Sequence, residues 1–474
     1  MATATGRKSS TKSTKSTKST SSTGPAADLR TMQVPMLVTP VIPGPKSKEI
    51  HERTARLMKG LSGQVKLFPV AFEAGAGTHL RDVDGNCYLD FSSGIYVTTL
   101  GHCHPRVTEA VQKYAGQLMN CHDFSTEIKM RLLEKMTGIL PGDLAGGIQL
   151  YDAGTAAVEA GIRACRAITG KHEFLSCFRD FHGKSGHAAS LARANRTNGA
   201  GRAQGFYMVP RPDPYRPHFR KADGTIDTDA YIAFYREFIT EATTGQVAAF
   251  VLEPIQGWAG SVFPPDDFFP KLRKLCDELK VMLFADEVLT SMGRTGEWLA
   301  MNHYGVVPDV VTLGKGFGNG FPVTAMCVRK PYAESFEAIS ASTSYGGNPM
   351  ACAAALACIE AIEEEKLLEN ARELGAFFDE RMAGMQSRHK IIGHVRGKGC
   401  LMGIELVKDR TTKEPFDEAG KRVYQKAFRK GLAWIPAGHI LRLSPPIVMD
   451  LKEAALGMDI VEEAIGETEK ELGY

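Results

Sequence analysis

Short apolar runs that alternate with helical patterns are the feature of this sequence that most constrains its fold. The runs are partly β-branched and shorter than typical helices, so they indicate strands that are buried on both faces. Helical patterns lie between several of them, for example at residues 155–168 and 266–279. Strand–helix alternation of this kind predicts an α/β fold with a doubly wound, mostly parallel sheet. The predicted strands are residues 147–152, 173–178, 247–254, 281–287, 309–314 and 323–328.

Segments outside this alternation predict a second, smaller domain. Residues 78–91 contain an Asp-Gly pair between two alternating segments, which is a hairpin signal. Pro349 stands at the start of a long helical pattern, a position that tolerates proline, and residues 401–406 indicate a further strand. We interpret the N-terminal hairpin and the C-terminal segments as a smaller α+β domain. The expected units are a tail at 1–30, an arm and part of the small domain at 31–95, the large domain at 96–345 and the rest of the small domain at 346–474.

The first 30 residues differ from the rest of the chain. They repeat Ser, Thr and Lys with almost no apolar content, so they cannot bury enough surface to fold, and we expect a disordered tail. A basic start that is rich in Ser and poor in acidic residues is also typical of organelle transit peptides. The triplet repeat has no amphipathic face, which favours a solvated tail on a cytoplasmic protein.

The overall composition narrows the class of protein. A net charge of +3 predicts no surface for nucleic acid or for a membrane. The ten cysteines lack CxxC spacing and suit a reducing compartment. His102, Cys103 and His104 are adjacent in the chain, and neighbouring residues seldom converge on one ion. We therefore expect these three residues to be structural and no metal to be bound.

Lys315 and Asp286 each lie at the end of a predicted strand. The carboxyl ends of parallel strands are where open α/β sheets bind ligands. A lysine forms a Schiff base with an aldehyde cofactor, and an aspartate holds a pyridinium nitrogen, so the pair suits pyridoxal phosphate (PLP). The alternative, a solvated lysine and a helix cap, is disfavoured by the buried strands that precede both residues. The glycines around Lys315 match neither a Walker loop nor a GxGxxG fingerprint.

Three stretches around these residues carry a resemblance to a known family. They are ADEVLTSMGRTG at 285–296, TLGKGFGNGFP at 312–322 and SYGGNPMACAAAL at 344–356. They resemble the class III PLP-dependent aminotransferases, of the ornithine and 4-aminobutyrate type. DVDGNCYLDFSSGI, GHCHP, DAGTAAVEA, FHGKS, EPIQG and RLSPP match too, in the family's order, over roughly residues 65 to 470. The resemblance implies a fold-type I PLP enzyme that is a homodimer with its active site at the subunit interface.

The resemblance also implies which residues hold the cofactor. Gly154 and Thr155 open a helix after a predicted strand, and the N–H groups of such a terminus bind phosphate. Ser344 matches a position that reaches the phosphate in the neighbouring subunit, with Thr343 as a nearby substitute. The other members of the implied cofactor site are Phe181 and Val288 on the two ring faces, His182 in the same motif as Phe181, Asp286 at the ring nitrogen and Lys315.

The two catalytic residues are Lys315 and Asp286. Lys315 forms the Schiff base and moves a proton between the substrate and the cofactor, which requires a neutral amine, so burial should lower its pKa. Two neighbouring positions depart from the family. Ala156 stands where a glutamate is usual, and Leu289 replaces a glutamine that hydrogen-bonds the ring hydroxyl.

For the substrate, the resemblance implies Arg442 as the arginine that grips an α-carboxylate. Trp258 replaces the glutamate that covers this arginine in 4-aminobutyrate and ornithine enzymes. We therefore expect Arg442 to stay open to carboxylates, and purely apolar amines to be poor substrates unless Trp258 shields the guanidinium by stacking. Lys184 replaces a second arginine and attracts a carboxylate without a rigid fork. The other expected substrate residues are Ile95, Tyr96 and Glu253.

Two activities fit these residues. The first is transfer of an amino group from an amino acid or ω-amine, above all a 4-aminobutyrate-like donor, to a 2-oxo acid such as 2-oxoglutarate or pyruvate. The second is an amino-acid racemase or epimerase on the same scaffold. Residues 211–217, RPDPYRP, resemble a segment in both groups and favour neither. A binding module without catalysis is disfavoured because Lys315 and Asp286 are both in place.

Overall fold

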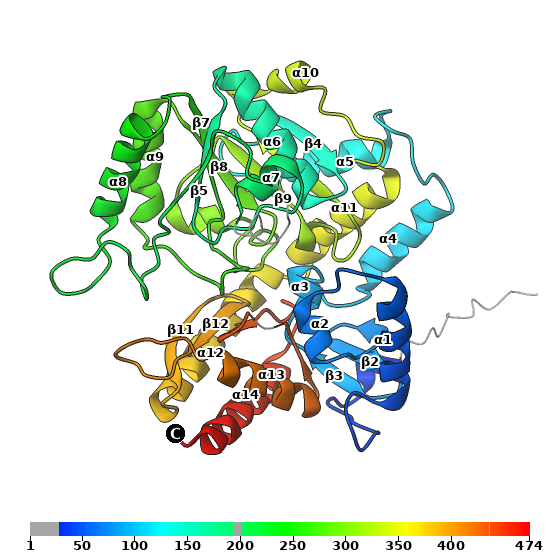
Figure 1. Ribbon diagram of the computed structural model, residues 1–474. Helices are drawn as coiled ribbons and strands as arrows, with labels where there is room; N and C mark the ends of the chain where they lie inside the picture. Colours follow the sequence, from blue (N-terminus) through cyan, green and yellow to red (C-terminus); the bar gives the residue numbers. More distant parts are fainter. Residues whose placement is uncertain (1–27, 193–200, 436) are drawn as a thin grey trace, which may run out of the picture.

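A seven-stranded sheet forms the centre of the upper part of the molecule in Figure 1. The computed structural model describes residues 28–474 apart from 193–200 and 436. Strand β10 is antiparallel to both of its neighbours, and the remaining pairs are parallel. The strand order is β4 (Gly147–Tyr151), β10 (Thr324–Val328), β9 (Val310–Leu313), β8 (Met282–Glu287), β7 (Val247–Leu252), β5 (Glu173–Cys177) and β6 (Phe206–Val209). The six predicted strands are confirmed, and β6 was not predicted.

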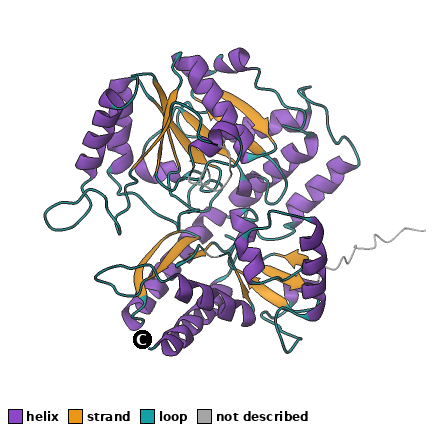
Figure 2. Cartoon of the chain, in the orientation of Figure 1, coloured by secondary structure: helices purple, strands orange, loops and turns teal. Residues whose placement is uncertain are grey.

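Helices cover both faces of this sheet, which explains why its strands are apolar throughout. Phe250 of β7 packs in one apolar cluster with residues of α8 (Thr228–Glu241) and α9 (Phe268–Leu279). Its neighbour Val251 packs in another cluster with residues of α6 (Gly154–Thr169). Successive side chains of a strand point to opposite faces, so the two clusters lie on opposite sides of the sheet. The predicted doubly wound α/β fold is confirmed (Figure 2).

Two smaller sheets lie in the lower part of Figure 1 and combine both ends of the chain. The predicted Asp-Gly hairpin is confirmed, because β2 and β3 are antiparallel and Gly85 has a φ of 92° in the turn. Strand β3 then pairs in parallel with the distant β13. One sheet is β1 (Phe72–Ala76), β2 (His79–Asp82), β3 (Cys87–Asp90) and β13 (Leu432–Ala433). The other is β11 (Ile392–Lys398), β12 (Leu401–Leu406) and β14 (Ile440–Leu443).

Two of the helices begin where their sequences supply clear start signals. Pro349 is the first residue of α11, as predicted, and the side chain of Asn348 accepts a hydrogen bond from the N–H of Ala351. Asp450 and Glu453 form a capping box at the start of α14. The other helices are α1 (Pro45–Leu57), α2 (Gly63–Leu67), α3 (Ser93–Tyr96), α4 (Pro105–Ala115), α5 (Glu127–Ile139), α7 (Gly186–Ser190), α10 (Ser335–Ile339), α11 (Pro349–Glu364), α12 (Leu367–Arg388), α13 (Asp417–Arg429) and α14 (Leu451–Leu472), with 3₁₀ turns at Asp28–Thr31, Ala300–Tyr304, Lys315–Phe317 and Lys330–Tyr332.

The predicted disordered tail is too long at its C-terminal end. Its residues 1–27 lie outside the described part of the chain, but Asp28–Thr31 form a 3₁₀ turn. Leu29 is buried, and its carbonyl oxygen lies 2.7 Å from Nδ1 of His79. One apolar side chain therefore anchors the chain before residue 31. Among the described helices, none combines the length and apolarity that a membrane span needs.

Candidate active site

The predicted catalytic residues meet at one edge of the large sheet. Strands β5, β7, β8 and β9 are parallel, and β4 runs in the same direction because both β4 and β9 are antiparallel to β10. The carboxyl ends of these strands therefore share an edge, where such sheets bind ligands. The residues that follow or end the strands at this edge are Gly154, Phe181, His182, Glu253, Asp286 and Lys315.

Asp286 is a buried carboxylate with three hydrogen-bond donors. Its Oδ2 lies 2.8 Å from Nδ1 of His182, and its Oδ1 accepts from the Thr312 hydroxyl at 2.8 Å and the Val288 N–H at 3.1 Å. Burial opposes the negative charge, but the hydrogen bond and charge of His182 outweigh it and hold the pKa of Asp286 below its ordinary value. Asp286 is thus an anion at neutral pH, as a partner for a pyridinium must be.

His182 is held between two buried aspartates. Its Nδ1 contacts Asp286, and its Nε2 lies 3.6 Å from Oδ2 of Asp180. Burial would lower the pKa of His182, but Asp180 and Asp286 outweigh burial and raise this pKa to about 10. His182 is therefore an imidazolium at neutral pH. The sequence reasoning named His182 without this role and missed Asp180, although Asp180 directly precedes the Phe181-His182 motif.

Lys315 lies at the start of a 3₁₀ turn directly after Gly314. Its φ is 45°, a left-handed conformation that is uncommon for a residue with a side chain. Burial lowers the pKa of Lys315, Arg442 lowers it further, and the negative charge of Asp286 acts in the opposite direction. The net shift is downward, which increases the fraction of neutral amine.

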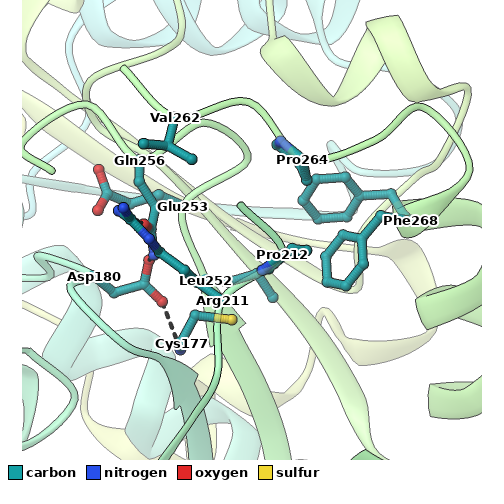
Figure 3. A pocket seen from close by; sticks show the side chains of 11 residues that line it. Cys177, Asp180, Arg211, Pro212, Leu252, Glu253, Gln256, Val262, Pro264 and Phe268 are labelled. Carbon is teal, nitrogen blue, oxygen red and sulfur yellow. Dashed lines mark hydrogen bonds between the residues drawn. The ribbon is translucent and has the colours of Figure 1, made fainter. Parts of the chain in front are cut away.

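Glu253 is a buried acid beside this cluster. Its two oxygens accept from the N–H of Phe181 at 2.9 Å and the N–H of Gly257 at 3.1 Å. Burial and the nearby carboxylates of Asp180 and Asp286 raise the pKa of Glu253 to about 8, so it is mainly neutral at pH 7. Next to Glu253 lies a cavity of about 20 Å³ that is also lined by Asp180, Arg211 and Gln256 (Figure 3).

Glycines let the backbone pack closely against Val288. A Cβ built on Gly314 would lie 2.9 Å from Cγ1 of Val288, and a Cβ on Gly154 would lie 3.1 Å from the same atom. The N-terminus of α6 at Gly154 therefore approaches the sheet edge closely. The hydroxyls of Thr155 and Ser185 lie 2.6 Å apart beside this terminus. N–H groups, a helix dipole and hydroxyls form a donor set that suits a phosphate.

Arg442 is covered by aromatic rings. Its Cζ lies 4.3 Å from the centroid of the Trp258 ring and 5.8 Å from that of Tyr96, and its guanidinium donates to the carbonyl oxygens of Trp258 and Ile435 at 3.5 and 3.4 Å. Arg442 is only 2% exposed, whereas Trp258 is 38% exposed. The expectation that Arg442 stays open is wrong in this structure. Trp258 stacks on the guanidinium, which is the condition under which apolar amines were not expected to be poor substrates.

A left-handed turn brings Tyr96 to Arg442. Ser93, Gly94, Ile95 and Tyr96 have φ values of 46°, 57°, 77° and 64°. The turn is held by a 2.7 Å hydrogen bond from the Ser93 hydroxyl to the carbonyl of Ser444, two residues beyond Arg442 in the chain. Tyr96 is buried by the turn and Ile95 is exposed. Three side chains in a strained conformation next to a binding arginine are typical of a functional site.

Two predicted site residues have exposed side chains and lie outside the buried part of the site. The side chain of Lys184 is exposed, and so is that of Ser344, whose carbonyl accepts from Asn120 at 2.9 Å. The Thr343 hydroxyl accepts from the N–H of Gly346 at 2.7 Å, so it is already used in the turn. Leu289 packs in an apolar cluster with Tyr96 and offers no hydrogen bond.

Comparison with known proteins decides between the classes of site that this geometry allows. A family model described as aminotransferase class-III matches residues 61–465. The chain belongs to the class III aminotransferases. It is therefore a PLP-dependent enzyme, and the buried aspartate, the lysine and the helix terminus are a donor set that fits PLP.

Class III relatives and neighbours differ in their named activities. The chain is 33% identical to a leucine/methionine racemase of Thermococcus litoralis over 435 residues, which cover 90% of the chain and 97% of the relative. It is also 33% identical to a 4-aminobutyrate aminotransferase of Mycobacterium leprae over 438 residues, with the same coverage. An amine transaminase from an uncultivated Pseudomonas species, solved with PLP bound, superposes with a TM-score of 0.80 at 28% identity and covers 87% of this chain and 98% of its own. These matches confirm the fold-type I architecture.

Proposed function

We propose that this class III enzyme transfers an amino group from an ω-amine or amino-acid donor, with 4-aminobutyrate-like donors favoured, to a 2-oxo acid such as 2-oxoglutarate or pyruvate. The observation that carries the proposal is the position of Trp258. It stacks on Arg442 at 4.3 Å and shields the carboxylate-binding cation of the site with an indole. Donors without an α-carboxylate therefore contact the apolar indole of Trp258 instead of the guanidinium of Arg442.

Lys315 and Asp286 perform the catalytic work in this proposal. Bound PLP supplies an aldehyde for covalent attachment of amines and an electron sink for the charge that develops at Cα. Lys315 would attach the cofactor, and its Nζ would move the proton from the amine-bearing carbon of the substrate to the aldehyde carbon of the cofactor, for which its lowered pKa is favourable. Asp286 stays anionic beside His182 and holds the proton on the ring nitrogen.

The remaining cofactor residues orient the ring and the phosphate. We assign the phosphate to the N–H groups of Gly154 and Thr155 and to the Thr155 hydroxyl, since α6 begins there. Val288 would lie under one ring face and Phe181 over the other. The ring centroids of Phe181 and Trp258 are 5.7 Å apart. The aromatic residue proposed to stack on the cofactor therefore contacts the one that stacks on Arg442.

The donor preference follows from the cost of an unpaired charge. An α-carboxylate placed against the Trp258 ring would lose water without gaining a hydrogen bond, which is strongly unfavourable. An α-carboxylate, of a 2-oxo acid or of an amino acid, gains the bidentate pair with Arg442 only once Trp258 moves away, whereas a carboxylate-free donor needs no such movement. Lys184 is exposed at the end of the Phe181 motif and can attract the distal carboxylate of a 4-aminobutyrate-like donor.

A racemase is the second candidate, because the relative from Thermococcus litoralis bears that name. Racemisation also needs proton exchange at Cα by Lys315, but it produces no 2-oxo acid. It requires an α-carboxylate on its only substrate, so every turnover needs Trp258 to leave Arg442, whereas transamination from a carboxylate-free donor needs this movement only for the 2-oxo acid.

A panel of substrates tests the proposal. Purified enzyme is incubated with 4-aminobutyrate, with an aryl-alkyl amine that lacks a carboxylate, and with L-leucine, each with pyruvate or 2-oxoglutarate. Carbonyl products are measured beside optical rotation. We expect carbonyl products from the first two donors that depend on the 2-oxo acid. Loss of optical rotation from L-leucine without a keto acid, and no product from the other donors, would establish the racemase instead.

We also propose that two copies of the chain form the active unit. Exposed apolar side chains gather near Ser344: Leu118, Met119 and Phe124 lie on the loop that Asn120 ties to Ser344, and Tyr345 follows it. An exposed apolar patch of this kind marks an interface. A second copy would cover it and bring Ser344 to its partner's phosphate.

Phe124→Glu should therefore weaken both dimerisation and PLP retention by about tenfold or more, because it places a charge in an apolar interface. The apolar-to-acid control is Leu456→Glu on α14, which is also exposed. Sedimentation and PLP occupancy are measured over a dilution series. A monomer with full PLP occupancy at every dilution contradicts the proposal.

A further inference from the structure

The loop that carries Trp258 packs directly on the small sheet that carries Arg442. The loop is closed at its base by two backbone hydrogen bonds between Gln256 and Val262, of 3.0 and 3.1 Å. At its tip, a Cβ on Gly260 would lie 2.5 Å from Cδ1 of Ile440, next to Arg442 in strand β14. A Cβ on Gly403, which is paired with Arg442, would lie 2.5 Å from the Gly260 carbonyl oxygen. The loop thus packs against the Ile440 side chain of strand β14 and against the backbone of strand β12 at Gly403.

Arg396 of strand β11 holds the tip of this loop. Its Nε donates to the carbonyl oxygens of Gly260 at 3.0 Å and Ser261 at 2.9 Å. Its Nη1 donates to Oε2 of Glu405 at 2.9 Å. Because Arg396 binds backbone oxygens within three residues of Trp258, its position restricts where the indole can go.

Glu405 joins Arg396 to the segment 211–217, which favoured neither activity in the sequence. Its Oε1 accepts from Nε of Arg216 at 2.6 Å. Burial would raise the pKa of Glu405, but His439, Arg396 and Arg216 outweigh burial and hold this pKa far below its ordinary value. Glu405 is a buried anion between two guanidinium groups. Removing either guanidinium group would leave Glu405 as a buried charge with one partner fewer, which strongly destabilises the folded protein.

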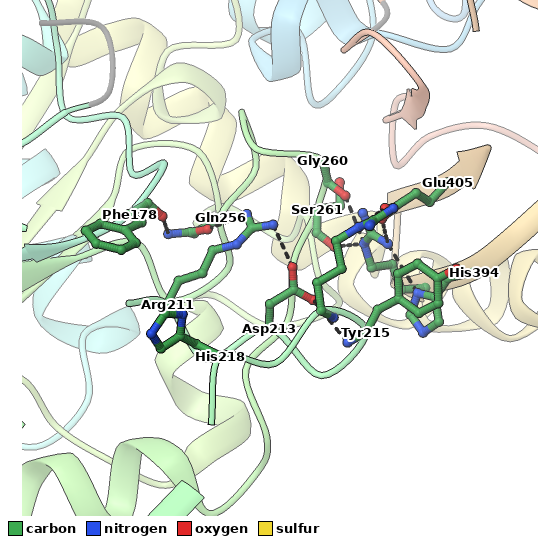
Figure 4. Close-up of polar contacts among 12 residues, drawn as sticks. Phe178, Arg211, Asp213, Tyr215, His218, Gln256, Gly260, Ser261, His394 and Glu405 are labelled. Carbon is green, nitrogen blue, oxygen red and sulfur yellow. Dashed lines mark hydrogen bonds and ion pairs between the residues drawn. The ribbon is translucent and has the colours of Figure 1, made fainter. Parts of the chain in front are cut away.

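The same segment returns to the base of the loop. Asp213 accepts from the N–H of Arg216 at 3.2 Å and from Nη2 of Arg211 at 2.6 Å. Nη1 of Arg211 donates to Oε1 of Gln256 at 2.9 Å, where the loop begins. A continuous chain of polar contacts therefore connects Gln256 at the base of the loop to Gly260 and Ser261 at its tip (Figure 4). We call the following side chains the loop clamp: Arg211, Asp213, Arg216, Gln256, Arg396 and Glu405.

We propose that the loop clamp determines donor specificity by holding Trp258 over Arg442. This inference rests on the proposed function and extends it to residues that touch neither substrate nor cofactor. Trp258 is 38% exposed, and its ring contacts are with Arg442 and Phe181, so its own packing restrains it weakly. The clamp fixes the loop backbone relative to the strand of Arg442. With the clamp loosened, the indole leaves the guanidinium, and α-carboxylates gain access to it.

Two substitutions test the clamp at different places. Arg396→Met removes the hydrogen bonds to Gly260, Ser261 and Glu405. Arg216→Met breaks the clamp at a side chain that is 27% exposed, where misfolding is less of a hazard. The measurement is the ratio of kcat/KM for a carboxylate-free amine to kcat/KM for L-leucine, each with pyruvate. We expect both variants to lower this ratio at least tenfold. Arg388→Met, which removes a surface ion pair of Glu462, is the matched control and should leave it within twofold.

A double-mutant cycle separates positioning from a general loss of structure. In a Trp258→Ala background the clamp has no indole to position, so adding Arg396→Met should change the ratio less than twofold. A ratio that stays unchanged in folded Arg396→Met and Arg216→Met overturns the proposal. So does a ratio that falls equally with and without Trp258.

Acrylamide quenching of tryptophan fluorescence gives a second measurement that needs no turnover. The Trp258 contribution, obtained as the difference from a Trp258→Phe variant, should become more quenchable in Arg396→Met. If the substrate panel shows a racemase while quenching rises as expected, the proposed function fails and the clamp stands. Unchanged quenching contradicts the clamp whatever the reaction.

Discussion

Lys315→Ala is expected to abolish transamination and the covalent attachment of PLP. Loss of a positioned proton-transfer group alone costs about 10²–10⁴-fold in rate, and loss of the attachment point adds to it. We therefore expect kcat to fall by at least ~10³-fold. The exposed Lys274, replaced in the same way, is the control and should leave the rate unchanged.

Borohydride treatment of the PLP-loaded enzyme locates the attachment independently of activity. Reduction should fix the cofactor on one tryptic peptide, and that peptide should contain Lys315. The buried setting supports this expectation, because Lys315 has a lowered pKa and Asp286 lies close enough to act on it electrostatically. Recovery of the label on a different lysine would show that the site has been assigned wrongly.

Arg442→Ala should separate the two halves of the reaction. Truncating one partner of a buried charge pair costs about 2–5 kcal/mol, so kcat/KM for 2-oxoglutarate or pyruvate should fall by roughly 30- to 5,000-fold. A carboxylate-free donor meets the indole rather than the guanidinium, and its own half-reaction should change little. Single-turnover measurements of each half-reaction check both expectations.

Trp258→Glu is the complementary change. It exchanges a stacked cover for an ion pair on Arg442 and should improve turnover of 4-aminobutyrate-like donors. If Arg442→Ala leaves the 2-oxo acid half-reaction unchanged, Arg442 is structural, and another cation holds the carboxylate. Lys184 is the first alternative, because it is exposed at the end of the Phe181 motif.

The large sheet could be predicted from sequence because its signals are local. The strands at 282–287 and 310–313 are short, apolar runs whose partners lie on both faces, so composition alone identifies them. Gly85 indicates a turn because glycine adopts a positive φ readily. Pro349 indicates a helix start because its fixed φ suits the first position of a helix. Strand β6 was not predicted, because half of it is only partly buried and it lies at the edge of the sheet.

The electrostatics of the site could be predicted only in part. Lys315 and Asp286 were identified from their positions after strands, but the charge on His182 depends on Asp180, in a loop whose path the sequence does not specify. The stacking of Trp258 on Arg442 joins residues 184 positions apart. Arg396 reaches the same loop from a third segment, 135 positions away. Contacts of this kind arise from tertiary packing, and no local pattern encodes them.

The left-handed turn at Ser93–Tyr96 has a consequence for laboratory evolution of this enzyme. A residue with a side chain costs roughly 1–2 kcal/mol in this conformation, and glycine avoids the cost. Ile95, with a φ of 77° and an exposed side chain, therefore makes the fold less stable than a glycine would. Selection for heat resistance alone should favour glycine at position 95, and this substitution would remove an exposed side chain beside the buried Tyr96. Because Ile95 is also a predicted substrate residue, we expect thermostability and substrate selectivity to be coupled at this one position.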